Sequence, residues 1–407
     1  MWANTIFFTK YHSTTSWRNS RAGGQVIFDQ GTGIQPFLPP VPANADHSPL
    51  QKAFTLVLII VKPIAGALKL ILVSIVALVL ILLQTLGLVL SPLPPLHRIY
   101  SRLISAILLR VILVLLGFFW IRHEVVTLKR GRGSGASKAQ SSSRKQATSG
   151  ELIVCNWSSY IDVLYLAFRY NPVFTQIYSE TLTVRQVSLW EALCQSGSYP
   201  DLSPPEGVET LPLMDFVKAM YKKGAGPVVI FPEGTTTNNR AILKFIPIFK
   251  DCSVPETSVD ISIVALKYDY SKFAPTFTIG LDNSYRLGHL FRTCAQFYNT
   301  LSVKSLASDE SPSSAYFSAM DGLASTTSGA ALGVVEPVEE DALGGVIINL
   351  MGRMTRFRKL GLNVKDKADF LDYFILRNNG ISRTKKTVVT SKTSTTTSAT
   401  AARSKRR

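Results

Sequence analysis

A run of 21 residues without a charged side chain, Leu70 to Leu90, constrains the fold of this 407-residue chain more than any other feature. At about 1.5 Å per residue, a helix of that length just spans the roughly 30 Å hydrocarbon core of a bilayer. A second apolar run, Leu103 to Trp120, carries Arg110 in its middle, and an arginine at mid-membrane costs at least about 2.5 kcal/mol. The two runs predict a membrane hairpin with a re-entrant second leg; a buried helix of a soluble core is the alternative.

Basic residues lie on both outer sides of this hairpin. Because Lys and Arg are retained on the cytosolic side of a membrane, we expect both ends to face the cytosol. The proline-rich turn between the runs also suits insertion into the monolayer of a lipid droplet, so a full span and a one-leaflet hairpin both remain open. The basic residues are Lys52, Lys62 and Lys69 before the first run, and Arg122, Lys129, Arg130 and Arg132 after the second.

The net charge of +17 is unevenly distributed. Residues 151–380 carry a net charge of −4, whereas residues 381–407 carry eight basic and no acidic side chains. A nucleic-acid-binding domain should place its basic residues on the folded surface, not beside apolar runs and in a Ser/Thr-rich tail. We therefore predict an anionic membrane or droplet surface as a partner and no nucleic acid.

The four cysteines are widely spaced and form no Cys-x-x-Cys pair. In a chain of this length, that usage favours a reducing compartment and argues against a zinc site. We expect neither a metal nor a redox cofactor.

Composition divides the chain into five parts. The Gly/Ser/Lys-rich stretch after the hairpin cannot bury apolar surface and should be a flexible linker. The predicted parts are a polar N-terminal segment (1–52) with the motif GTGIQPFLP, a membrane anchor (53–121), a basic linker (122–150), a folded domain (151–380) with a low-complexity insertion (302–345), and a basic disordered tail (381–407).

The folded domain alternates short apolar runs with amphipathic stretches, which predicts an α/β fold. The predicted strands are Leu152 to Cys155, Pro227 to Phe231, Ile261 to Lys267 and Thr276 to Gly280. The predicted helices are Asp162 to Tyr170, Val184 to Gln195 and Leu213 to Lys222.

A polar turn follows the second of these strands, in the sequence PVVIFPEGTTTNNRAILKF (227–245). Gly234 lets the backbone approach a ligand closely, and Arg240 supplies a cation. Backbone N–H groups and polar side chains at a strand end can donate to an anion, so the turn suits a phosphate-bearing substrate. A solvated strand-to-helix turn is the alternative. The candidate side chains are Glu233, Thr235, Thr236, Thr237, Asn238 and Arg240.

A second polar segment, VCNWSSYIDVLYL (154–166), ends an apolar strand at Asn156 and opens a helix near Asp162. The carboxylate of Asp162 suits either acid–base chemistry or helix capping.

Together these segments resemble the glycerophospholipid acyltransferase superfamily. That family's first motif is Asn-His-x4-Asp and its third is Phe-Pro-Glu-Gly-Thr, which is kept here from Phe231 to Thr235, about 70 residues after the first. The segment Ile261 to Asp269 resembles a later strand motif, while the second motif is not identifiable in residues 176–212. The motifs GTGIQPFLP and NWSSYID narrow the resemblance to the fungal lysophosphatidic acid:oleoyl-CoA acyltransferase branch.

The resemblance implies a mixed sheet with flanking helices, of the glycerol-3-phosphate acyltransferase kind. It implies transfer of a fatty acyl chain from acyl-CoA, as co-substrate, to lysophosphatidic acid, with phosphatidic acid as product. Glu233 and Arg240 would hold this lysophospholipid acceptor, and Gly234 with the following Thr and Asn residues would complete the turn. The implied location is the endoplasmic reticulum membrane or the lipid droplet, with the domain facing the cytosol.

One position departs from the family pattern, because Trp157 stands where the family has its catalytic His. An indole N–H donates a hydrogen bond but cannot take a proton. One candidate base is then Asp162 itself, acting directly or through a water. The other candidate is His289, the one histidine in residues 151–380, for which a structural role is the alternative. The remaining alternative is a pseudo-acyltransferase that has lost its chemistry and binds lipid, on droplets or in membrane trafficking.

Overall fold

The computed structural model describes most of the hairpin and the folded domain. The predictions for residues 1–28, 381–407 and most of the linker and the insertion lie outside the described residues. The described residues are 29, 32–40, 49–90, 92–128, 150–250, 252, 259–270, 273–280, 283–314, 317 and 341–378.

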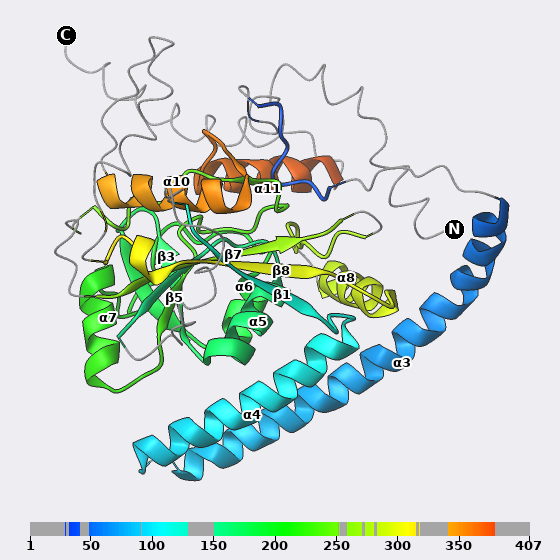
Figure 1. Cartoon of the computed structure of the whole chain (residues 1–407), viewed down its shortest axis with the longest axis horizontal. Helices are drawn as coiled ribbons and strands as arrows, with labels where there is room; N and C mark the ends of the chain where they lie inside the picture. Colours follow the sequence, from blue (N-terminus) through cyan, green and yellow to red (C-terminus); the bar gives the residue numbers. More distant parts are fainter. Residues whose placement is uncertain are drawn as a thin grey trace, which may run out of the picture.

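Two long helices form the predicted hairpin. α3 (Pro49–Gly87) is followed by a short 3-10 turn (Leu88–Leu90) and by α4 (Pro94–Leu115). The two helices lie side by side along one edge of the molecule, lengthwise against the domain (Figure 1). Gly66 of α3 lies so close to the domain that a Cβ there would be 3.0 Å from the Cβ of Ala295. The domain therefore covers one side of the hairpin.

Arg110 lies near the carboxyl end of α4 rather than alone in an apolar environment. Its guanidinium donates to the carbonyl oxygens of Phe118 (3.0 Å) and Phe119 (2.6 Å), and lies 5.8 Å from the ring centre of Phe168. Arg110 thus joins the hairpin to the turn that enters the domain.

The domain is built on a seven-stranded mixed sheet, which confirms the predicted α/β class. The strand order is β1-β8-β7-β2-β5-β3-β4, and the pairs β3–β4 and β7–β8 are antiparallel while the other neighbours are parallel. The strands are β1 (Ile121–Val126), β2 (Leu152–Cys155), β3 (Val173–Tyr178), β4 (Thr183–Val187), β5 (Val228–Ile230), β7 (Ile261–Tyr268) and β8 (Leu301–Leu306). The short strands β6 (Ala241–Ile242) and β9 (Arg358–Lys359) pair separately.

Helices cover both faces of the sheet. Alternating side chains along the central strands face two cores: Val154 packs with α7 and α10, whereas Ile153 and Cys155 pack with α5 and the hairpin. α10 and α11 lie above the sheet in Figure 1, on the side opposite the hairpin. The helices are α5 (Tyr160–Tyr170), α6 (Leu189–Gln195), α7 (Leu213–Lys222), α8 (Asn283–Ala295), α10 (Ala342–Thr355) and α11 (Val364–Asn378), with a 3-10 turn at Ser308–Glu310.

Two predicted elements are wrong. The stretch 184–195 is not one helix: β4 runs to Val187, and Ser188 caps α6 by accepting from the backbone N–H of Glu191. The stretch 276–280 is not a strand, because its N–H groups bond to loops; Phe277 donates to the carbonyl of Ser158 at 2.8 Å. In both stretches the local sequence favours regular structure, but hydrogen bonds to other parts of the chain determine the conformation.

Several predicted boundaries also shift. Residues 49–52 of the predicted N-terminal segment belong to α3, and residues 342–345 of the predicted insertion belong to α10. Residues 122–126 of the predicted linker belong to edge strand β1, and residues 302–306 of the predicted insertion belong to β8, between β1 and β7. Polar residues alternate with apolar ones in β8. Because two of the polar residues are serines, the composition of this stretch resembles that of a low-complexity segment. The sheet thus includes residues on both sides of the linker.

The N-terminal motif packs against α11 at the far end of the chain. Phe37 is fully buried against Phe370, and the ammonium of Lys367 lies 4.8 Å from the Phe37 ring centre. Lys367 is itself fully buried and donates to the carbonyl oxygen of Thr278 at 2.6 Å. Burial lowers the pKa of Lys367 to about 7. The motif, the segment 273–280 and α11 therefore form one packed unit.

The buried Lys367 predicts a pH-dependent stability. Above pH 7 the folded chain releases this proton, whereas the unfolded chain keeps it up to the ordinary lysine pKa of 10.5. The unfolded state then binds more protons, so the stability associated with Lys367 rises with pH, by at most about 1.4 kcal/mol per pH unit. We expect the free energy of unfolding of wild type, relative to a Lys367→Met variant, to increase between pH 7 and pH 10 in denaturant titrations.

The exposed neighbour Lys365 provides the control. A Lys365→Met variant should differ from wild type by the same amount at both pH values. A pH-independent difference for Lys367→Met would contradict the prediction.

Candidate active site

The two polar segments meet where three parallel neighbours end. β2, β5 and β7 are adjacent in the sheet, and their carboxyl ends lead into residues 156–162, residues 231–240 and Tyr268. Ligands of open α/β sheets bind outside this edge. We call these residues the polar centre.

Asp162 is fully buried and accepts three hydrogen bonds. Its Oδ2 accepts from the backbone N–H groups of Ser158 (2.6 Å) and Ser159 (2.9 Å), and its Oδ1 accepts from the hydroxyl of Tyr268. Ser159 and Asp162 form the capping box of α5. Burial raises the pKa of Asp162 to about 7, against the opposing effect of these donors. The capping role is therefore present, and it leaves a carboxyl group that titrates near neutral pH.

Glu233 joins the two polar segments. It is fully buried, and its carboxylate accepts from the backbone N–H of Trp157 (3.3 Å) and of Leu243 (3.1 Å). Burial raises its pKa to about 8. Glu233 thus fixes the loop after β2 relative to the turn after β5, and its carboxylate oxygens point to protein backbone.

The turn after Glu233 is tight and buried. Gly234 has a φ of +65°, and a Cβ there would lie 2.6 Å from Ile246 Cδ1, so this position requires glycine. Thr235, Thr236 and Thr237 are all buried, and Thr237 donates its backbone N–H to the carbonyl oxygen of Trp157 at 3.0 Å. The Thr236 hydroxyl has no hydrogen-bond partner within the described ranges.

Asn238 holds the N-terminal motif. Its side-chain amide donates to the carbonyl oxygens of Gln35 (2.6 Å) and Leu38 (2.9 Å), and its backbone N–H donates to that of Pro36 (2.8 Å). Both amide protons are therefore used by the chain itself, so the predicted ligand-binding Asn238 is a structural residue in this conformation.

Two residues that were not among the predicted site residues complete the polar centre. Asn239, at φ +61°, donates to the Ser158 hydroxyl (2.8 Å) and to the Leu266 carbonyl (2.8 Å), and accepts from the backbone N–H of Tyr268 (2.9 Å). Tyr268 is the Asp162 partner. The available signal was the strand alternation of ISIVALKYD, which places Tyr268 on the same face as Leu266, toward α5.

Trp157 packs as a ring and leaves its donor unused. Its indole stacks on Phe231 with ring centres 4.8 Å apart and an interplanar angle of 17°. It is 7% exposed, and Nε1 has no hydrogen-bond partner among the residues that are described. A buried donor without a partner is costly in a protein, so a hydrogen-bond acceptor placed at Trp157 Nε1 would be favourable.

The structure does not bring His289 to Asp162. His289 lies on α8, with Nδ1 3.1 Å from the hydroxyl of Tyr160 and its ring 5.0 Å from that of Phe277. Burial lowers its pKa to about 4, so the imidazole is neutral near pH 7.

Arg240 lies at the surface, unlike the rest of the turn. Its side chain is exposed, and the guanidinium lies 5.6 Å from the ring centre of Tyr270. The cation is thus placed beside the buried turn, where an anionic group arriving from solvent can reach it.

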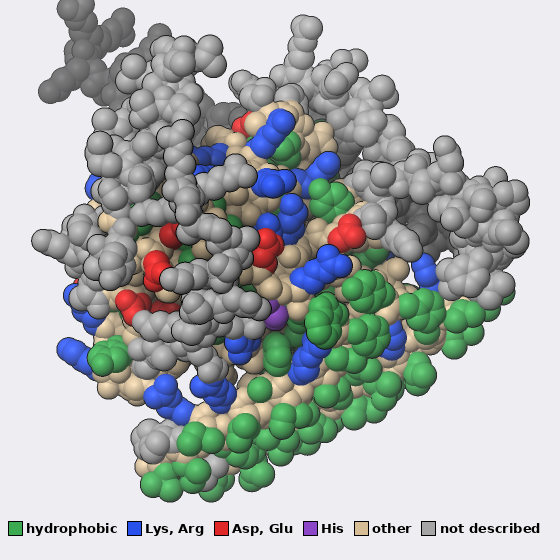
Figure 2. Space-filling model, in the orientation of Figure 1, with side chains coloured by type: hydrophobic (Ala, Val, Ile, Leu, Met, Phe, Trp, Pro, Cys, Tyr) green, Lys and Arg blue, Asp and Glu red, His purple; other side chains and the backbone are tan. Residues whose placement is uncertain are grey.

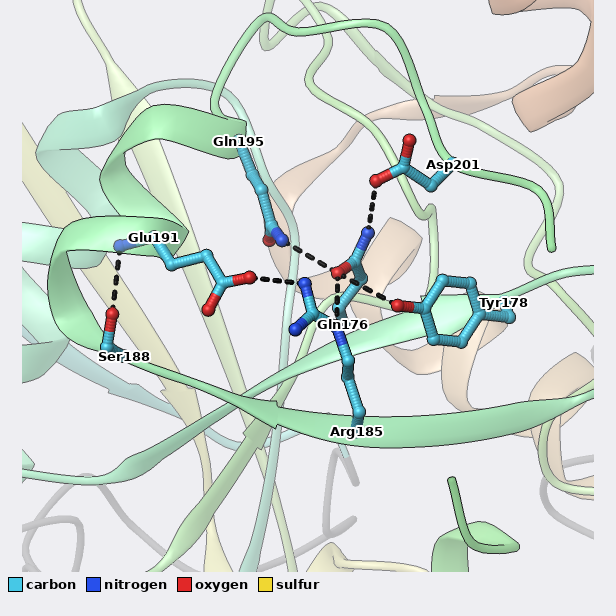
Figure 3. A network of polar contacts seen from close by, with 7 residues as sticks. All are labelled: Gln176, Tyr178, Arg185, Ser188, Glu191, Gln195 and Asp201. Atoms are coloured by element: carbon cyan, nitrogen blue, oxygen red, sulfur yellow. Dashed lines mark hydrogen bonds and ion pairs between the residues drawn. The ribbon is translucent and has the colours of Figure 1, made fainter. Parts of the chain in front are cut away.

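A separate polar network occupies the region in which the family's second motif was sought (Figure 3). Gln176 Oε1 accepts from Arg185 Nε (2.9 Å) and Gln195 Nε2 (2.8 Å), and Arg185 also pairs with Glu191. The other members are Tyr178, Ser188 and Asp201. Arg185 therefore serves to hold β3, β4 and α6 together.

The polar centre offers two buried carboxyl groups with raised pKa values, one hydroxyl bonded to a carboxylate, one free indole donor and one exposed cation nearby. Groups that titrate near pH 7 are suited to proton transfer, and a buried free donor suits stabilisation of an oxyanion. This arrangement can support removal of a proton from an alcohol that attacks an acyl group.

Comparison with known proteins agrees with this chemistry. Residues 136–252, which contain Asp162 and Glu233, match the family model described as Acyltransferase. A Schizosaccharomyces pombe protein provisionally named lysophosphatidic acid:oleoyl-CoA acyltransferase is 34% identical over 116 residues, which are 28% of this chain. The chain spans 38% of the length of that relative. No solved structure matches the chain. Residues 136–252 therefore carry the sequence signature of the Acyltransferase family.

Proposed function

We propose that this protein is a membrane-bound O-acyltransferase that moves a fatty acyl chain from acyl-CoA to lysophosphatidic acid. The observation that carries the proposal is the family match over the segment in which Asp162 and Glu233 are buried together at the strand ends. The name of the fission yeast relative supports the choice of acceptor. Arg240 is the exposed cation suited to the acceptor phosphate. No metal or redox cofactor is part of the proposed reaction.

The hairpin supports a membrane location. One described segment, Ile60–Gly87, is long and apolar enough to cross a bilayer. Many of its large apolar side chains are exposed, and Figure 2 shows a continuous hydrophobic strip along the edge occupied by α3 and α4. Exposed apolar surface of this extent marks an interaction site. The lipid is the proposed partner of the strip, in the endoplasmic reticulum membrane or on lipid droplets, with the domain in the cytosol.

The domain contacts favour a hairpin that enters one leaflet. Lys69, in the middle of α3, donates to the carbonyl oxygen of Gln296 at 2.9 Å, so the polar domain lies beside the centre of the helix. A span across the bilayer would bring α8 and its polar surface to mid-membrane depth, where unsatisfied polar groups are costly. A hairpin lying along the membrane surface avoids this cost.

A pseudo-acyltransferase that binds lipid is the second candidate. It is favoured by Trp157 in place of the family's His, and by the backbone hydrogen bonds that both carboxyl groups already accept. The two candidates differ in turnover, which the following experiment measures.

We expect full-length protein in detergent to convert labelled oleoyl-CoA and lysophosphatidic acid to phosphatidic acid. A variant with Asp162→Asn and Glu233→Gln should lose at least about 100-fold in turnover, because removal of acid–base catalysis typically costs about 10²- to 10⁴-fold. A variant with Asp201→Asn and Glu206→Gln makes the same changes at exposed positions and should keep its activity.

Thermal melting of both variants shows whether each is folded. If wild-type turnover is no higher than that of the Asp162/Glu233 variant, the proposal that the protein is an enzyme is wrong. The lipid-binding pseudo-acyltransferase is then the remaining candidate.

Membrane binding should depend on the exposed face of α3. Changing Ile71, Leu78 and Leu82 to Ser removes apolar side chains that are 56–58% exposed. If each buries about half of its surface in lipid, the change costs roughly 1 kcal/mol per residue, or roughly 100-fold in partitioning for all three. Sedimentation with anionic vesicles measures this, and Ser at the exposed domain residues Tyr199, Val208 and Leu211 should have no effect.

A protease site inserted at Pro94, at the start of α4 beside the hairpin turn, tests the orientation. In intact microsomes a one-leaflet hairpin leaves this site accessible from the cytosolic side. A site that is shielded until the membrane is permeabilised would contradict the one-leaflet hairpin.

A further inference from the structure

The side-chain partner of Asp162 comes from β7, a predicted strand whose last residue, Tyr268, was not among the predicted site residues. Tyr268, the last residue of β7, donates its hydroxyl proton to Oδ1 of Asp162, while both backbone donors bind Oδ2. Oδ2 of Asp162 therefore caps α5, while Oδ1 binds the tyrosine hydroxyl. Oδ1 is the oxygen through which Asp162 can exchange a proton with another side chain.

Residue 157 cannot fill this role. Trp157 stacks on Phe231, its backbone N–H binds Glu233, and an indole carries no basic nitrogen. A phenol hydroxyl is different, because it both donates and accepts a hydrogen bond. While Tyr268 donates to Asp162, lone pairs on its oxygen can accept from a substrate hydroxyl.

We propose that Tyr268 relays the proton of the acceptor hydroxyl to Asp162, and so replaces the missing histidine as the group that touches the reacting alcohol. This inference rests on the proposed acyl transfer. It changes the role of Asp162 from base in contact with substrate to terminal proton acceptor behind Tyr268.

The step balances without a further reactant. The acceptor oxygen attacks the thioester carbonyl of acyl-CoA, forming a C–O bond, and its proton passes to Tyr268 Oη. The original Tyr268 proton passes to Asp162 Oδ1, so the tyrosine stays neutral. The C–S bond then breaks, and the proton returns from Asp162 through Tyr268 to the departing CoA thiolate.

Tyr268 lies on the hairpin side of the polar centre. Its ring contacts that of Phe118, edge to face at 6.2 Å, in the turn that follows α4. Tyr268, Trp157 and Phe118 belong to the apolar core that the domain shares with α3 and α4. The side of the polar centre on which Tyr268 and Trp157 lie is therefore the side that packs against the hairpin.

The ionisation of the pair agrees with a relay. Burial and the adjacent Asp162 raise the pKa of Tyr268 well above its usual range, so it remains a donor at every physiological pH. The pKa of Asp162 is raised to about 7 by burial, so this carboxyl group exchanges protons near neutral pH. The other titratable groups that act on this pair are Cys155, Tyr160 and Glu233, and each has a raised pKa.

Tyr268→Phe tests the relay, because it removes one oxygen and keeps the ring against Phe118. We expect wild-type kcat to rise with pH through about 7, since Asp162 must be ionised to accept a proton. In Tyr268→Phe we expect kcat to fall about 100-fold at every pH between 5.5 and 9, with KM for both substrates within about twofold of wild type. Tyr178→Phe removes another hydroxyl from a buried tyrosine, outside the polar centre, and should leave kcat unchanged.

Each other result has a distinct meaning. If Asp162 contacts substrate directly, the Tyr268→Phe variant keeps its kcat at high pH. The pH at which its kcat rises then moves upward, because loss of the hydroxyl donor raises the pKa of Asp162. This result overturns the relay. Changed melting with unchanged kinetics overturns it as well, and shows a structural pair. Wild-type protein without any transfer refutes the proposed function itself, before the variant is compared.

Discussion

Two carboxyl groups buried at the ends of adjacent strands impose the arrangement of everything around them. Neither Asp162 nor Glu233 has a cationic partner among the described residues; both are satisfied by neutral donors, chiefly backbone N–H groups. Burying such groups without partners would cost several kcal/mol. The loop after β2 and the turn after β5 must therefore stay together. Burial raises both pKa values, and the hydrogen-bond donors oppose the rise.

Hydrogen bonds extend this constraint to parts of the chain that are distant in sequence. Asn239 and Tyr268 join the polar centre to β7, and Asn238 joins it to the N-terminal motif. On the opposite side, Tyr268 and Phe118 connect it with the core of the hairpin. The helices proposed to meet lipid and the groups proposed to move a proton thus belong to one apolar core.

Particular residues show how far the sequence could predict this structure. The apolar run from Leu70, the strand that ends at Cys155 and the helix that starts near Asp162 were all predicted, because periodicity and length report burial directly. The break before α6 and the strand β8 were not, since Ser188 and the serines of β8 have meaning only in contact with their neighbours. Asn238 was predicted as a ligand residue, but its amide binds residues 35 and 38, about 200 positions away.

The sequence by itself determined the class of the molecule: an apolar hairpin, an α/β domain, and two polar strand ends with Asp162, Glu233 and no histidine between them. Residue types and their spacing are local properties, so they could be read directly. Only the tertiary structure decided that the hairpin lies lengthwise against the domain, that His289 points to Tyr160, and that Tyr268 binds Asp162. These facts depend on which strands become neighbours, and strand order follows from packing of the whole sheet.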